Sequence, residues 1–417
     1  MSERPLFRHR ALGSSLRRGA CTGAVAVLMT TPAYAQIDSE VVVSASAGYD
    51  SNPFLAFGGD RDVASFRLEL VPTISRSDEI SSIRVSGRVE HVEYARLYDS
   101  AQNLSANVDA TYRINERLDV AARVQIASTI STTDFTRPVE ADGDSDGLPP
   151  PIDDDITLLG DRQRRNTASA QASLHYIASE FDDIRWTALV QTQRYPSSNN
   201  LEDSDYASQQ IAYTRRLNED ITLGGVLAGS ISNFRNGRAG DAKMISPQLS
   251  FGIRLAPRFE VSGSAGLSFT RTKLAQGTSS STTFAGNLSL CYKVTLDNFC
   301  LTGSRQVLPS AIGGVREQSS IGASYSRRLS ERDTIQLGGS YATASSPLTG
   351  IGGDFESVRG YARYDRQLTE KLTLFASAGY SDSSDDLGGK RSNVQGVIGI
   401  SSRFGGVRSA TIVWNGR

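Results

Sequence analysis

The chain is poor in histidine, has no strong excess of charge, and lacks long apolar runs beyond its first thirty residues. Of the three histidines, only His91 and His175 lie beyond the N-terminal 35 residues, which leaves little material for a histidine-based nucleophile relay or metal site. No stretch after Met29 approaches the about 20 apolar residues of a transmembrane helix, which excludes a helical membrane protein. The 44 basic and 45 acidic residues give a net charge of -1, which argues against nucleic acid binding.

The N-terminal 35 residues have the order of a secretory signal peptide. An arginine-rich start precedes a short apolar stretch from Ala20 to Met29, and Ala33-Tyr34-Ala35 provides small residues before Gln36. We therefore predict that residues 1–35 are a cleaved signal peptide. The flanks of Arg17-Arg18 fit a twin-arginine signal poorly, so export through Sec is favoured. Cys21 lies at the start of the apolar stretch and not at its end, which argues against a lipoprotein anchor.

From Val41 onward, segments of about ten residues alternate between apolar and polar side chains, as transmembrane β-strands require. Successive side chains of a strand point to opposite faces, so Leu104, Val108 and Tyr112 share one face and Asn107 and Asp109 the other. We expect about 18 such strands, within a range of about 16 to 20. They lie near 41–51, 65–77, 81–96, 104–114, 118–130, 164–178, 183–195, 205–217, 221–233, 243–256, 258–272, 282–294, 298–308, 318–329, 334–346, 356–368, 372–382 and 391–404.

The composition of the polar face distinguishes a membrane barrel from a soluble sandwich. It is rich in Ser, Thr, Asn, Gln, Gly and Arg on every segment, whereas a sandwich would enclose an apolar core. The sequence therefore predicts an all-β fold, a transmembrane antiparallel up-and-down β-barrel over residues 36–404, in the outer membrane of a Gram-negative bacterium. Its lumen would be wet, and lipid and lipopolysaccharide would surround it.

The connections between the predicted strands alternate between short and long. A tyrosine, basic residues, a Leu or Ile and a polar turn recur at Tyr112–Glu116, Tyr213–Glu219, Tyr325–Glu331 and Tyr364–Glu370. We interpret these as tight periplasmic turns with tyrosines in an interfacial girdle. The longer connections, at 52–64, 131–163, 196–204, 234–242, 273–281, 309–317, 347–355 and 383–390, are then extracellular.

The C-terminal end has two interpretations. Many outer-membrane barrels finish on a strand with a terminal aromatic residue, and Phe404 fits that position. Residues 405–417 are then a folded tail, or they form a nineteenth strand.

The segment Ser46-Ala47-Gly48-Tyr49-Asp50-Ser51-Asn52-Pro53-Phe54-Leu55 resembles the opening of outer-membrane β-barrel porins associated with exopolysaccharide biosynthesis and export loci. The tyrosine–arginine turns are also similar to theirs. The resemblance implies a passive conduit or accessory for polysaccharide passage, without a catalytic set. A group with a similar opening, the barrels of surface lipoprotein assembly modifiers, carries a helical-repeat domain for which residues 36–41 leave no room.

Cys291 and Cys300 have the same inward parity on the two strands that flank the turn at Thr295-Leu296. An antiparallel register places them opposite each other, and the periplasm oxidises such pairs, so we predict a structural disulfide. The alternative is a pair of unlinked thiols in a slipped register.

The longest connection contains alternating carboxylates that resemble a calcium-binding loop. Asp142, Asp144 and Asp146 precede Gly147, and Asp153 takes the twelfth position. Pro149 replaces the usual apolar residue and the flanking helices are missing. We keep three interpretations: a Ca²⁺ site, which is the one cofactor considered, a solvated acidic loop, or a loop that folds inward toward Arg162, Arg164 and Arg165.

The predicted inward charges are mixed in sign, which argues against a strongly ion-selective channel. They are Arg67, Glu69, Arg84, Arg88, Glu90, Asp109, Arg123 and Lys293. No Ser, Asp or Asn can be placed beside His91 or His175, so we predict no enzyme activity. The sequence favours a porin-like conduit or accessory for the passage of a solute or exopolysaccharide, and both uncharged and zwitterionic solutes are compatible with the mixed charges. The alternative is a structural or adhesive barrel with a closed lumen and loops that bind partners.

Overall fold

The computed structural model describes residues 36–58, 61–130, 162–196, 201–235, 240–274, 277–310, 314–345, 354–385 and 389–405. They form eighteen strands. These are β1 Gln36–Asp50, β2 Val63–Ser77, β3 Ser81–Tyr94, β4 Ala101–Asn115, β5 Leu118–Ile130, β6 Arg164–Ile177, β7 Asp182–Arg194, β8 Ser204–Arg216, β9 Ile221–Phe234, β10 Asp241–Ala256, β11 Phe259–Leu274, β12 Gly277–Lys293, β13 Asp297–Pro309, β14 Val315–Arg328, β15 Asp333–Ser345, β16 Phe355–Thr369, β17 Leu372–Asp385 and β18 Gly389–Gly405.

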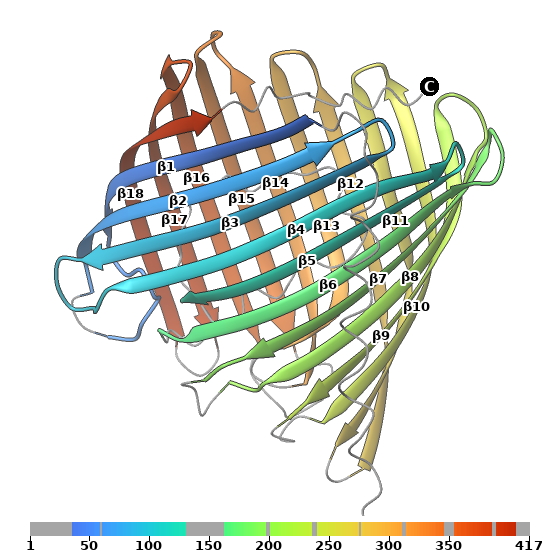
Figure 1. Cartoon of the computed structure of the whole chain (residues 1–417). Helices are drawn as coiled ribbons and strands as arrows, with labels where there is room; N and C mark the ends of the chain where they lie inside the picture. Colours follow the sequence, from blue (N-terminus) through green and yellow to red (C-terminus); the bar gives the residue numbers. More distant parts are fainter. Residues whose placement is uncertain are drawn as a thin grey trace, which may run out of the picture. The chain divides into compact units, whose positions relative to one another are not determined.

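The strands form one closed antiparallel sheet in which each strand pairs with its neighbours in sequence (Figure 1). β1 pairs with β18 from Glu40 opposite Gly405 to Asp50 opposite Gln395, so the barrel closes with 18 strands. The predicted fold class and strand number are confirmed. Residues 406–417, where a tail or a nineteenth strand was predicted, and the predicted signal peptide lie outside the described residues.

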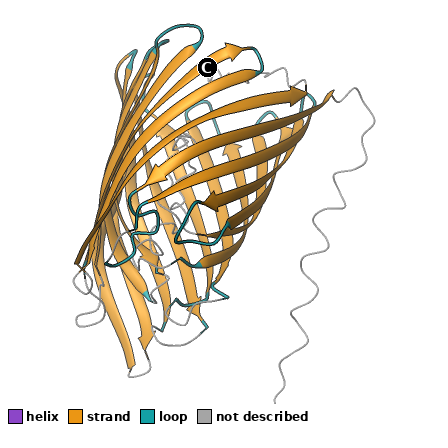
Figure 2. Ribbon diagram, turned by 90° about the vertical axis from the view of Figure 1, so that its left-hand side faces the viewer, coloured by secondary structure: helices purple, strands orange, loops and turns teal. Residues whose placement is uncertain are grey.

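The two faces of the sheet differ in polarity, as the alternation predicts. Large apolar side chains such as Leu104, Ile126, Leu249 and Phe284 are exposed on the outer face, while their strand neighbours on the inner face are mostly polar. Figure 2 shows the same wall from the side, built from strands and loops alone in its described part. A closed barrel satisfies its backbone hydrogen bonds internally, which the interior of a membrane demands. The apolar outer face therefore meets lipid, and the protein is an outer-membrane barrel.

Among the described residues, no helix combines the length and the apolar character needed to cross a membrane.

The tyrosines of the turn repeat bind the start of the neighbouring strand. The hydroxyl of Tyr213 donates to Asp182 Oδ1 at 2.6 Å, that of Tyr325 to Asp297 Oδ1 at 2.8 Å, and that of Tyr364 to Asp333 Oδ1 at 2.5 Å. Each aspartate is the first residue of its strand, and an arginine two positions after each tyrosine lies 3.6–3.9 Å from the same carboxylate. The repeat therefore fixes neighbouring hairpins to one another.

Tyr112, in the remaining copy of the repeat, has no aspartate partner of this kind. It lies opposite Ser81 in the register of β3 and β4, and the turn before it is built differently. The side chain of Asp78 there accepts hydrogen bonds from the hydroxyl and backbone N–H of Ser81 and from Ile80 N–H. These bonds, the Ser81 hydroxyl first, hold the pKa of Asp78 below its usual value.

β1 and β18, the first and last strands, are joined by polar side chains, several of which belong to residues 46–55, the segment with the family resemblance. Asn393 on β18 is fully buried and donates to Asp50 Oδ1 at 3.1 Å. Its Oδ1 accepts from Asn52 N–H at 2.7 Å and from the Ser51 hydroxyl at 3.2 Å. Asn52 in turn exchanges two hydrogen bonds with the backbone of Ala56. These opening residues therefore have a structural role, in which they hold β1 and its following loop against β18.

Candidate functional site: the lumen of the barrel

Two arcs of the inner wall differ in charge. On β2–β5 it carries Arg67, Glu69, Arg84, Arg88, Glu90, Asp109 and Arg123. On β8–β13 the inward residues away from the short turns are uncharged, and the ionic ones, Arg216, Arg254, Glu260 and Lys293, stand beside those turns. Seven of the eight predicted inward charges therefore lie on β2–β5, and further inward charges, Arg359, Arg363 and Asp365, lie on β16.

The charges on β2 and β3 form a connected network. Glu69 and Glu90 lie directly opposite each other in the register, an arrangement that is repulsive by itself. Arg88 lies between them, 2.6 Å from Glu69 and 3.8 Å from Glu90, and Arg67 is 3.1 Å from Glu90. The side chain of Glu90 is only 1% exposed, so these arginines replace its lost hydration.

The network continues into the next strand pair. Asp109 lies directly opposite Arg84 on β3 and Arg123 on β5, and Arg123 donates to its Oδ1. Opposite signs therefore alternate around this arc. An arc with this arrangement has little net field, which is unfavourable for strong ion selectivity.

The uncharged part of the wall holds a chain of hydroxyl and amide groups that crosses three strands. Asn287 Nδ2 donates to Ser264 Oγ at 3.0 Å, and Ser264 Oγ donates to Gln248 Oε1 at 2.5 Å. Gln248 Nε2 donates to Ser246 Oγ at 3.1 Å, which in turn donates to the carbonyl of Leu267 at 3.2 Å. Such groups exchange hydrogen bonds with water or with hydroxylated solutes.

The C-terminal end of β13 separates from β12 and turns into the lumen. Pairing of β12 with β13 ends at Gly286 opposite Arg305, whereas pairing of β12 with β11 continues to Gly277. Val307, beyond that point, is 4% exposed and packs with Ala242 and Met244 of the inner face of β10. A cavity of about 70 Å³ remains between this segment and the hydroxyl-rich wall. The β13–β14 end therefore narrows the lumen.

The connection between β1 and β2 narrows the same end from another side. Phe54 is buried against the inner-face residues Val63, Val92 and Tyr94 at the ends of β2 and β3. Its ring centroid is 5.8 Å from that of Tyr94, and the guanidinium of Arg162 lies 5.6 Å from the Phe54 centroid. The mouth on the long-connection side is therefore lined by aromatic and apolar residues.

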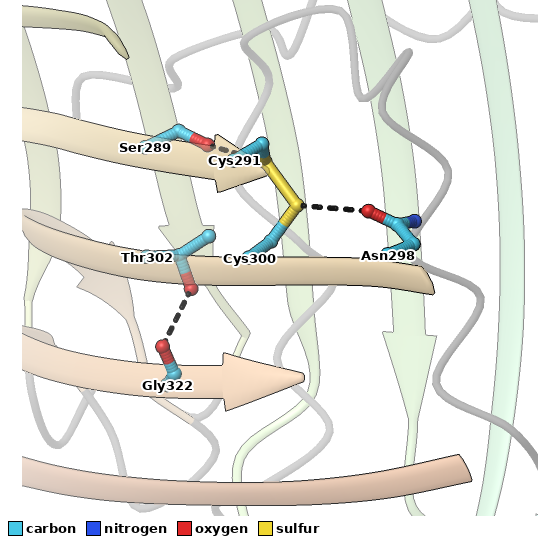
Figure 3. The surroundings of a disulfide bond; sticks show 6 residues. All are labelled: Ser289, Cys291, Asn298, Cys300, Thr302 and Gly322. Atoms are coloured by element: carbon cyan, nitrogen blue, oxygen red, sulfur yellow. Dashed lines mark hydrogen bonds between the residues drawn. A yellow bond between two sulfur atoms is a disulfide. The ribbon is translucent and has the colours of Figure 1, made fainter. Parts of the chain in front are cut away.

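The predicted cysteine pair is brought together by the hairpin of β12 and β13. Cys291 lies directly opposite Cys300, with Cα atoms 4.2 Å apart, and the two are joined by a disulfide (Figure 3). The neighbouring Thr302 hydroxyl donates to the carbonyl of Gly322 on β14 at 3.5 Å. The cysteines thus cross-link the turn end of this hairpin, on the strand whose other end turns inward.

The other predicted sites are not assembled by the described residues. Asp142, Asp144, Asp146 and Asp153 lie outside the described part, within which no metal-binding cluster occurs. Arg162 donates to the carbonyls of Asp99 and Ser100, and Arg164 donates to Ser128 Oγ.

The two histidines share no site. His91 faces outward, with Nε2 3.4 Å from Glu93, and His175 faces inward, with Nε2 3.6 Å from Asp183.

Sequence reasoning missed both segments that narrow the mouth. The alternation places Val307 on the outward parity, and nothing in it shows where β13 leaves β12. Phe54 belongs to a segment noted only for its family resemblance. The apolar run Val307-Leu308-Pro309 at the end of β13 is the one signal that suggests a buried end.

Comparison with known proteins adds structural likenesses at low sequence identity. No protein-family model matches the chain, and no curated protein matches it. The predicted family resemblance therefore stays a prediction.

Three barrels of Pseudomonas aeruginosa are similar in structure. OccK2 (OpdF), in complex with glucuronate, is 9% identical with a TM-score of 0.47 over 89% of this chain and 99% of its own. The outer membrane protein OpdK is 10% identical, with a TM-score of 0.46 over 88% and 99%. OprD is 11% identical, with a TM-score of 0.45 over 89% and 96%.

Proposed function

We propose that this protein is a porin-like channel of the outer membrane that passes uncharged or zwitterionic hydrophilic solutes without catalysis. The observation that carries the proposal is the pairing of lumen charges on β2–β5 opposite a wall of hydroxyls and amides. Barrels of about 16–18 strands leave an aqueous channel when nothing fills them. Paired charges give little preference for either sign of ion, while hydroxyl and amide groups replace the hydration of a polar solute.

We further propose that the solute is a saccharide, and that the channel serves as a conduit or accessory for exopolysaccharide. Two features support this: the resemblance of residues 46–55, and the hydroxyl and amide chain from Ser246 to Asn287. Neutral sugars present many hydroxyls and no charge, so such a wall offers them matching donors and acceptors.

Single-channel recording in planar bilayers tests the first proposal. Purified barrel should give stable conductance steps, with a reversal potential near zero under a KCl gradient. No steps after verified insertion would instead favour the rival, a structural or adhesive barrel with a closed lumen.

Blocking experiments test the saccharide. Neutral oligosaccharides should interrupt the current at lower concentration than anionic oligosaccharides of equal length. The variant Gln248→Ala should weaken that block, while Gln209→Ala, on the outer face of β8, should leave it unchanged. An equal block by both classes, or by neither, would remove the saccharide proposal and leave the channel standing.

A further inference from the structure

The outer face of β10 and β11 carries three basic residues at the rim on the long-connection side. Lys243 lies directly opposite Arg271, and Lys273 follows Arg271 by two residues on the same face. Adjacent side chains of the same charge on opposite strands repel each other. The nearest acidic residue in the register, Asp241, faces Lys273 and accepts from Phe234 N–H. The cluster therefore keeps a net positive charge.

Three other basic residues on the outer face of this rim have acidic partners. Arg235 pairs with Asp205 on β8, Arg305 with Glu317 on β14, and Lys390 with Asp382 on β17. Within the described ranges, Lys243, Arg271 and Lys273 form no ion pair. This cluster thus differs from those three residues by lacking a counter-charge from the chain.

The depth of the cluster places it at the headgroups. β11 begins at Phe259, whose ring lies 4.7 Å from that of Tyr292 at the short-turn girdle. About a dozen residues separate Phe259 from Arg271, compared with about 9–11 that a tilted strand needs to cross the hydrocarbon core. Arg271 therefore lies just outside the hydrocarbon core of the membrane, on the side of the long connections.

Apolar side chains lie directly below the basic ones. Ile245 is paired with Phe269, and both are about half exposed on the outer face. A groove of about 470 Å³ lies between these apolar residues and the basic ones. Most of the residues that line it are outward-facing, namely Lys243, Ile245, Phe269, Arg271, Ser280 and Thr282. The surface therefore combines cations above with an apolar patch below, which matches a phosphorylated lipid.

We propose that Lys243, Arg271 and Lys273 bind the phosphate groups of lipopolysaccharide in the outer leaflet, with Ile245 and Phe269 against its acyl chains. A phosphate between Lys243 and Arg271 removes their mutual repulsion, and both cations suit it as donors. Each basic residue near an anionic membrane surface adds about fivefold to binding. The site lies on the lipid side of the wall, so it is independent of what passes through the lumen.

The test compares two triple variants that remove the same charge. The first is Lys243→Gln/Arg271→Gln/Lys273→Gln, and the control is Arg235→Gln/Arg305→Gln/Lys390→Gln, which removes cations that already have partners. The probe is bisphosphorylated lipid A in detergent micelles, titrated against purified, heat-modifiable barrel. The first variant should bind it at least tenfold more weakly than the wild type, and the control within about twofold, given the cost per charge.

Dephosphorylated lipid A should bind the wild type and the first variant equally. Equal losses in both triple variants would mean that net charge alone attracts the lipid, and that result would overturn the site. Equal binding of both lipids to the wild type would overturn it too. If the triple variant does not fold, the singles Lys243→Gln and Lys243→Arg replace it. The arginine variant should keep the affinity that the glutamine variant loses.

Discussion

Asn393 near the start of β18 donates a hydrogen bond of 3.1 Å to Asp50 at the end of β1, although 343 residues separate them in the chain. With Ser51 and Asn52, this contact locks the first strand to the last. The residues that suggest a family opening in the sequence are thus the ones that the structure uses to close the barrel.

Asn393→Ala should destabilise the folded barrel by about 2–4 kcal/mol, because it removes the buried hydrogen bonds that Asn393 makes to Asp50 and to Asn52 N–H. The measurement is the midpoint of urea unfolding in lipid vesicles, followed by the loss of heat-modifiable migration. Ser392→Ala, on the exposed outer side of the same strand, is the matched control and should change the midpoint little. Equal midpoints for the two variants would contradict the lock.

Tyr364→Phe should destabilise the barrel by about 0.5–1.5 kcal/mol, since it removes the hydrogen bond to Asp333 and keeps the aromatic ring. Tyr112→Phe changes the copy of the repeat without an aspartate partner, and it should have no measurable effect. Unfolding midpoints of the two variants under identical conditions make the comparison. A similar loss in both would show that the tyrosines act through the membrane interface and not through the aspartate.

Cys291→Ser/Cys300→Ser should lower stability by about 2–3 kcal/mol, as expected for a cross-link that closes a short loop. In the wild-type protein, maleimide labelling of the unfolded chain should require prior reduction. The double variant should unfold at the same denaturant concentration with and without reductant. The wild type should unfold at a lower denaturant concentration when reductant is present. Immediate labelling of unreduced wild type would show that the cysteines are free thiols.

Glu90→Gln should shift the channel toward anion selectivity, because Arg67 and Arg88 lose the carboxylate that neutralises them. The readout is the reversal potential under a KCl gradient. Glu93→Gln removes the same charge from the outer face of the same strand and should leave the potential unchanged. If both variants behave alike, Glu90 does not face the conducting path.

Val307→Asp should raise single-channel conductance, since a carboxylate cannot remain packed against Ala242 and Met244. The inward end of β13 would then move away from β10. Ile321→Asn serves as the control, because Ile321 faces outward on the neighbouring strand β14, nearer the short turns. It should not raise the conductance of inserted channels. An unchanged conductance in Val307→Asp would mean that another segment sets the narrowest point.

The alternation of side chains predicts the sheet closely because lipid and water impose it residue by residue. The predicted fifth strand, 118–130, coincides with β5 Leu118–Ile130, and β9 differs from its prediction only at Phe234. The same pattern predicts Cys291 opposite Cys300, because register follows from a short turn. It does not predict the inward turn of β13, which depends on tertiary contacts between Val307 and a strand that is three places away in the sheet.

Part of the narrowing at the mouth is made by the wall itself. Residues 306–309 of β13 stay paired with β14 while they lean against β10. A separate plug can leave a pore without disturbing the sheet, but this segment cannot move far without breaking inter-strand hydrogen bonds. Any change of aperture at this point is therefore coupled to local unfolding of the sheet, and its rate is set by the strength of that strand pairing.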